Sequence, residues 1–186
     1  MKKFNLLVLA MLITISSYCQ SFMDVPVDGK LSEAVAKFKA KGFVVDQSNG
    51  ASSDTYVSMR GKMGSTTIEL NLVATPTTHT VWKYVVYLPK NDSWYSIKNE
   101  FYEYRKTLVS KYGLPSKDYS FFSSPYYEGD GYEMSALTLG KCSYYSFWDE
   151  LSISISKFKQ VCISYESKAN SKLDDEESEK LKSKSF

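Results

Sequence analysis

Few residues in this chain have the type and spacing that catalysis or metal binding requires. The 186 residues include one histidine, His79, and three cysteines, of which Cys142 and Cys162 lie in the second half. A general base is most often histidine, and a nucleophilic cysteine needs a base beside it. Nothing in the sequence places Cys142 beside His79. The sequence also lacks a Gly-x-Ser-x-Gly elbow, a glycine-rich phosphate loop and a zinc-type cluster. We therefore expect no catalytic residues, no metal and no cofactor.

Pairs of carboxylates, which suffice for a glycosidase, occur at several places, for example at Glu100 and Glu103. The chain has 21 acidic residues, so such pairs arise by chance. The acidic run Asp174–Glu177 lacks the turn spacing and the glycine of a calcium loop. A hydrolase with an unrecognised site is therefore the weakest of three functional interpretations.

Aromatic residues are more informative, because the chain has 15 tyrosines, 10 phenylalanines and 3 tryptophans. Two adjacent pairs, Tyr144-Tyr145 and Phe147-Trp148, lie in a predicted strand. Neighbouring residues of a strand point to opposite faces, so one member of each pair must face away from a one-sided core. Exposed tyrosine and tryptophan suit contacts with proteins or sugars. We select Tyr144, Tyr145 and Trp148 as candidate binding residues.

Two stretches with the spacing of amphipathic helices must help to position these side chains. The first spans about Lys30–Lys41, with Asp28 as a candidate cap and Gly42 as a left-handed stop. The second spans about Ser93–Tyr112 and ends at Gly113. Each helix has one apolar stripe, so each is expected to pack against something on one side only.

Alternating apolar and polar residues predict half-buried strands at Thr67–Ala74 and Leu151–Ser156. Short turns rich in glycine, proline and asparagine imply that the strands form antiparallel hairpins. Further strands are expected near Val44, Tyr56–Lys62, Val81–Leu88, Tyr119–Ser123, Glu133–Leu139, Ser143–Trp148 and Val161–Tyr165.

The elements occur twice in the same order. This order predicts an α+β fold of two α-β-β-β-β units, residues 22–90 and 91–166, in a single domain over residues 20–166 with one or two antiparallel sheets. One eight-stranded domain without an internal repeat is the alternative. If both helices pack on one face, the other face is open and carries polar residues of the two alternating strands. These open-face candidates are Thr67, Glu69, Asn71, Ser152 and Ser154.

Composition changes after residue 166. Residues 167–186 carry five lysines and five acidic residues and almost no apolar ones. Too little apolar surface is available there to offset the entropy of ordering. We expect a charged, disordered tail or a frayed helix.

Residues 1–19 have the pattern of a secretory signal peptide. Lys2 and Lys3 precede the apolar run Leu6–Ile15, which is too short to span a bilayer as a helix. Cleavage between Cys19 and Gln20 satisfies the small-residue rule. The alternative is a lipid anchor on Cys19 after signal removal. We expect a secreted or periplasmic protein without an integral membrane span in the mature chain.

Export would change the net charge of the mature chain and the redox environment of its cysteines. Without Lys2 and Lys3, 21 basic and 21 acidic residues remain. Nucleic-acid binding requires a surplus of positive charge, so we expect no such partner. Cys142 and Cys162 could form a disulfide in an oxidising compartment. A free buried thiol at Cys162 is the alternative.

Several short motifs carry a resemblance to known proteins. They are Asp24–Gly29 before the first helix, Lys41-Gly42-Phe43 after it, Gly61 in a strand and Lys111–Pro115 after the second helix. With these motifs, the stretch from Phe22 to Tyr165 resembles uncharacterised exported proteins of Bacteroidetes. The doubled helix-plus-four-strands order is similar to the β-lactamase-inhibitor-like architecture. That resemblance implies a binding module, although no inhibitory residue can be carried over.

These observations lead to a functional expectation. The chain should be an exported, non-enzymatic binding protein that engages a protein partner in the cell envelope or exterior through the open sheet face. A binder of glycans or small ligands that uses the same aromatic residues is the alternative.

Overall fold

The computed structural model describes residues 20–47 and 52–184. The expected signal peptide and the candidate lipid site at Cys19 lie outside the described residues.

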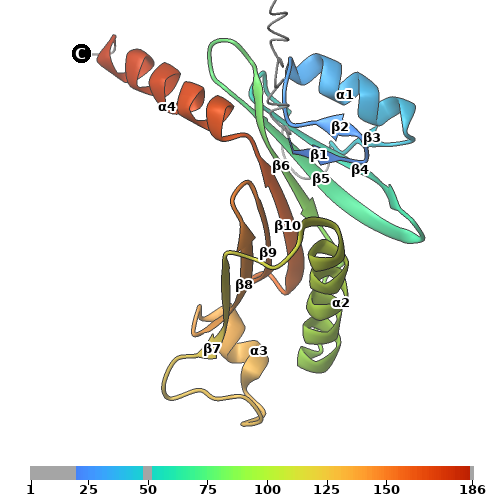
Figure 1. The fold of residues 1–186 in the computed structure, drawn as a ribbon, viewed down its shortest axis with the longest axis vertical. Helices are drawn as coiled ribbons and strands as arrows, with labels where there is room; N and C mark the ends of the chain where they lie inside the picture. The colour runs from blue at the N-terminus through green and yellow to red at the C-terminus, as the bar shows by residue number, and fades with distance from the viewer. Residues whose placement is uncertain (1–19, 48–51, 185–186) are drawn as a thin grey trace, which may run out of the picture.

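Eight antiparallel strands form one continuous sheet in the order β3-β4-β5-β6-β10-β9-β8-β7 (Figure 1). The strands are β3 (Val44–Val45), β4 (Tyr56–Met63), β5 (Thr66–Ala74), β6 (Val81–Tyr87), β7 (Lys117–Phe122), β8 (Cys142–Trp148), β9 (Leu151–Ser156) and β10 (Gln160–Glu166). Helix α1 (Leu31–Ala40) precedes the first four strands, and α2 (Trp94–Tyr112) precedes the second four. Each half contributes its four strands in sequence order from one edge of the sheet to the centre. The last strands of the two halves, β6 and β10, pair there. The predicted α+β fold of two α-β-β-β-β units is confirmed.

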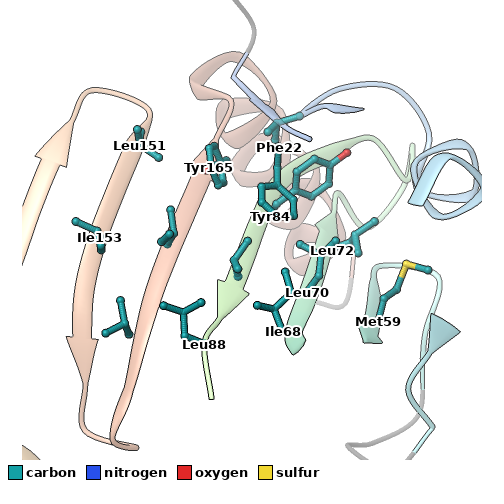
Figure 2. Packing of buried hydrophobic residues seen from close by; sticks show 14 of the residues in the cluster. Phe22, Met59, Ile68, Leu70, Leu72, Tyr84, Leu88, Leu151, Ile153 and Tyr165 are labelled. Atoms are coloured by element: carbon teal, nitrogen blue, oxygen red, sulfur yellow. The ribbon is translucent and has the colours of Figure 1, made fainter. Parts of the chain in front are cut away.

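Both helices pack on the same face of the sheet. Phe38 of α1 makes an edge-to-face contact with Tyr84 at 5.3 Å between ring centroids, and Phe101 of α2 makes one with Tyr144 at 5.9 Å. Figure 2 shows the apolar side chains that neighbouring strands contribute to this face, among them Leu70 and Ile153. Such alternation is what a half-buried antiparallel sheet requires. The core therefore lies between one face of the sheet and the two helices.

A small hairpin at the N-terminus closes this core. It consists of β1 (Ser21–Phe22) and β2 (Val25–Pro26), joined by Met23 and Asp24 in the left-handed region with φ of 49° and 62°. Phe22 is buried, and its ring lies 5.5 Å from that of Tyr165 (Figure 2). The hairpin therefore links the first residues of the described chain to its last strand.

The predicted helix ends are largely confirmed. The Ser93 hydroxyl caps α2 by accepting from the Ser96 N–H, and Gly113 ends that helix at φ 80°. Gly42 follows α1 at φ 87°. Asp28 does not cap α1, because the N-cap position is Lys30 and the Asp28 carboxylate accepts from the Gly29 N–H instead.

The prediction of a strand at Glu133–Leu139 is wrong, because this segment contains helix α3 (Glu133–Thr138). Its two buried residues, Ala136 and Leu137, are adjacent, which a half-buried strand would not allow. The Glu133 carboxylate accepts from the Gly129 N–H at 2.8 Å and so ties the first turn to the preceding loop.

Of the two expectations for residues 167–186, the disordered tail is wrong, because the described part of the segment is helical and packs on the rest of the chain. Residues Lys168–Ser183 form helix α4, which packs against the start of β6 and the β5–β6 hairpin (Figure 1). Ser167 caps the helix, and the Asn170 side-chain amide donates to the Val81 carbonyl at 2.8 Å. Polar contacts therefore order this helix where apolar burial could not. None of the described helices is both long and apolar enough to cross a membrane.

Candidate functional site

The face of the sheet opposite α1 and α2, called here the open face, is the candidate site. The strand registers align one row of its side chains across seven strands, namely Arg60, Glu69, Tyr87, Cys162, Ser154, Tyr145 and Tyr119. Of the described helices, α1 and α2 pack on the opposite face, and α4 contacts β6 near its start. The described residues of this face range from exposed, as at Arg60 and Tyr119, to buried, as at Ser58, Asn71 and Cys162.

Six of the eight candidate binding residues lie on the open face. Glu69 and Asn71 alternate with buried Leu70, and Ser152 and Ser154 alternate with buried Ile153. Tyr145 lies opposite Ser154, and Thr67 continues the same side of β5. Their placement follows from the period of two along each strand.

The other two candidates, Tyr144 and Trp148, lie on the covered face, so the prediction that they face a partner is wrong. Tyr144 is 3% exposed and Trp148 is 8% exposed. The Tyr144 ring packs against Trp94 of α2, and the Trp148 indole N–H donates to the Gly113 carbonyl at 2.8 Å. Tyr144 and Trp148 are each two residues from Ser146 along β8, so their side chains point to the same face as that of Ser146. Ser146 lies opposite Ile153 of the core. They stabilise the packing of α2 on the sheet.

Three open-face aromatics of β7 and β8 were not among the candidates. Tyr119 and Phe121 of β7 are 46% and 50% exposed, and Phe147 lies beside them on β8. With Tyr145 they form what we call the aromatic patch: Tyr119, Phe121, Tyr145 and Phe147. The rings of Tyr145 and Phe147 are 6.3 Å apart and nearly parallel at 14°, and those of Tyr119 and Tyr145 are 6.4 Å apart at 26°. The adjacent pairs in the sequence indicated that one member faces out, but not which one.

The other half of the open face is polar. Arg60 forms an ion pair with Asp46 at 2.7 Å, and the Ser58 hydroxyl lies 3.5 Å from the Glu69 carboxylate. The pKa of the Tyr56 phenol is raised, mainly by burial and to a smaller extent by the negative charge of Glu69. Burial likewise raises the pKa of Tyr87. Both phenols are therefore neutral hydrogen-bonding groups at physiological pH.

Of the two alternatives for Cys142 and Cys162, the disulfide does not form, and both thiols are free. The two residues lie on β8 and β10, with β9 between those strands. They also point to opposite faces, because Cys142 packs against the core whereas Cys162 lies in the open-face row. Burial, together with Glu128, raises the pKa of Cys142 to about 12, and burial raises that of Cys162 to about 11. Both thiols are therefore protonated and poor nucleophiles at neutral pH.

A concave region lies beside α1. It is an open groove of about 680 Å³ whose lining includes Lys30, Val35, Asp54 and His79. His79 is half-buried at φ 53° in the β5–β6 hairpin, and Cys142 belongs to the other half of the sheet. Within residues 20–47 and 52–184, no three His, Cys, Asp or Glu side chains are grouped to hold a metal ion. The groove shows no arrangement that identifies a reaction.

The fold and the open face define an α+β protein with a one-sided antiparallel sheet. Searches with this chain find no matching protein-family model, no matching curated protein and no matching solved structure.

Proposed function

We propose that this chain is an exported, non-enzymatic binding protein that engages a protein partner through its open face. The observation that carries the proposal is the aromatic patch, which lies on a broad and preformed sheet surface. Tyrosine and phenylalanine are enriched at protein interfaces because they bury a large area at a small cost in side-chain entropy. Ser154 and Ser152, which lie opposite Tyr145 and Phe147 of the patch, can supply hydrogen bonds.

Export is part of this proposal and rests on the sequence. The basic residues Lys2 and Lys3, the apolar run Leu6–Ile15 and the small residues before Gln20 support secretion or a periplasmic location, with a lipid anchor on Cys19 as the alternative. The intact mass of the exported protein distinguishes the two, because a lipid adduct on Cys19 contradicts cleavage before Gln20. The resemblance to exported Bacteroidetes proteins points the same way.

The substitution Ser154→Arg tests the use of the open face. Ser154 lies in the middle of the face, between Cys162 and Tyr145, so a long charged side chain there obstructs a partner without entering the core. Ser110→Arg is the matched control, because Ser110 is an exposed residue of α2 on the other side of the molecule. We expect a partner captured from envelope extract to be lost with Ser154→Arg and retained with Ser110→Arg.

Circular dichroism and thermal unfolding show whether both variants remain folded. If the same partner binds equally well to both folded variants, the open face is not the binding surface. If Ser154→Arg unfolds the chain, the face is more tightly packed than the proposal requires.

A glycan is the second candidate ligand, favoured by the nearly parallel rings of Tyr119, Tyr145 and Phe147. Sugar rings stack on such aromatic faces. Calorimetric titration with oligosaccharides, repeated with Tyr145→Ala, tests this alternative. Heat of binding that disappears in Tyr145→Ala supports a glycan, whereas no heat with wild type contradicts it.

A further inference from the structure

The two edges of the sheet differ in length. At one edge β3 has two residues, whereas at the other β7 has six. Among the described strands, β7 pairs with β8 alone, and residues 117–121 are all exposed. A long exposed edge with aromatic residues is a template for pairing with another strand, unless charges or a proline block it.

The charges of β7 do not block its edge. Lys117 and Asp118 lie together at the start of the strand, and the remaining four residues are uncharged. The Asp118 carboxylate is held on the covered face, where it pairs with Arg105 and accepts from the Ser146 hydroxyl at 2.7 Å. The stretch from Tyr119 to Phe122 is therefore available to a partner strand.

The hydrogen-bond pattern shows which backbone groups of β7 face outward. The Ser123 N–H donates to the Lys141 carbonyl, so odd-numbered residues of β7 bond to β8. In an antiparallel pair the bonded positions alternate, so the N–H and C=O groups of Asp118, Ser120 and Phe122 point away from the sheet. These three residues form the outer hydrogen-bonding edge.

We propose that β7 pairs in an antiparallel manner with β7 of a second copy of this chain, around a two-fold axis at Ser120. In this register Ser120 lies opposite the partner's Ser120, and Asp118 lies opposite the partner's Phe122. Each of the three outward-facing residues then exchanges two backbone hydrogen bonds with the residue opposite it, because even-numbered residues of one copy lie opposite even-numbered residues of the other. Shifting the register by two residues in either direction leaves part of this edge unpaired.

Side chains favour the same register. On the open face Tyr119 lies opposite the partner's Phe121, and aromatic cross-strand pairs are stabilising. Like charges do not meet, because Lys117 lies opposite the partner's Ser123. The two open faces become continuous, and the aromatic patches of both copies meet at the dimer axis. A closed two-fold pairing also explains how such an edge avoids open-ended aggregation.

Sedimentation and cross-linking test this dimer. We expect the purified wild-type chain to sediment at twice the monomer mass at micromolar concentration. Ser120→Pro removes an outward N–H while leaving the bonds to β8, and it should weaken dimerisation at least tenfold; Ser120→Thr keeps the N–H and should remain dimeric. Under mild oxidation Ser120→Cys should form a disulfide-linked dimer, because facing Cα atoms in such a pair are about 5.5 Å apart.

Lys117→Cys is the matched control for the register. Its Cα lies about 20 Å from that of the same residue in the partner, since six residues of strand separate the two positions, so it should not cross-link. A wild-type chain that is monomeric at all concentrations overturns the proposal, even if β7 binds an extended peptide. A dimer that survives Ser120→Pro, or that cross-links equally through Lys117→Cys, overturns it as well. Dimerisation rests on the sheet edge, so it can fail while binding through the open face stands.

Discussion

At the scale of single residues, Glu177 explains why α4 is ordered. Its carboxylate is 5% exposed and accepts hydrogen bonds from the Thr77 N–H at 2.7 Å, the Thr78 N–H at 3.0 Å and the Thr78 hydroxyl at 2.7 Å. Burial alone would raise the pKa of Glu177, but the hydrogen bonds from Thr78 and Thr77 outweigh it and lower the pKa to about 2. The β5–β6 hairpin thus binds a carboxylate of the chain's own C-terminal helix.

Glu177→Gln should therefore lower the free energy of unfolding by about 1–3 kcal/mol, because the ionised acceptor of three part-buried hydrogen bonds is lost. Urea unfolding at neutral pH measures the difference. Glu176→Gln is the control, since Glu176 is exposed on the same helix, and it should change stability by less than about 0.5 kcal/mol. Equal effects of the two substitutions would contradict the contact.

The same carboxylate predicts a dependence on pH. Its folded pKa of about 2 lies below the ordinary value of 4.5, so the stabilisation is complete above pH 4.5 and is lost as the pH falls toward 2. The difference in stability between wild type and Glu177→Gln should therefore shrink over that interval. A difference that stays constant from pH 6 to pH 2.5 would refute this origin.

At the scale of elements, Gly61 of β4 packs closely against Phe43, which follows α1. A Cβ atom on Gly61 would lie 2.4 Å from ring carbons of Phe43, which is 2% exposed. Gly61 is not in the left-handed region, so the backbone would accept alanine there. Close packing, not backbone conformation, therefore requires glycine at this position.

Gly61→Ala should thus destabilise the protein by about 1–3 kcal/mol through overpacking. Without the Phe43 contact, the same change would stabilise a strand interior by about 0.5–1 kcal/mol, so the sign of the effect is decisive. Lys62→Ala, at an exposed position of the same strand, serves as the control. Thermal unfolding of the two variants gives the comparison.

At the scale of the whole molecule, the two halves share one core. Strands β6 and β10 place Val86 opposite Ile163 and Tyr84 opposite Tyr165, and Phe22 contacts both Phe38 of the first half and Tyr165 of the second. The buried residues of both halves form one cluster. The halves should therefore not unfold separately.

We predict one cooperative unfolding transition by both near- and far-ultraviolet circular dichroism. Val86 is fully buried where the two halves meet. Val86→Ala should therefore lower the free energy of unfolding of the single transition by about 1–3 kcal/mol. Val85→Ala, the neighbouring residue on the open face, should have a smaller effect. Two separate transitions in either variant would show that the halves are independent.

The sequence predicted the elements that local chemistry controls. Helices α1 and α2 follow from apolar spacing and from Ser93, Gly42 and Gly113 at their ends. The alternating strands β5 and β9 follow from the period of two. Segment Glu133–Leu139 was misassigned because a short run of mixed residues has no decisive period.

The sequence alone therefore indicated an α+β protein with two amphipathic helices and antiparallel half-buried strands, because helix and strand periods are local properties of the chain. Only the tertiary structure decided which of Tyr144 and Tyr145 faces outward, because strand parity depends on the register with distant strands. It also placed Cys142 and Cys162 on opposite faces, which excludes the bridge that their spacing allowed. It ordered α4 through hydrogen bonds between Glu177 and Thr77, 100 residues apart in the sequence, which no local pattern could indicate.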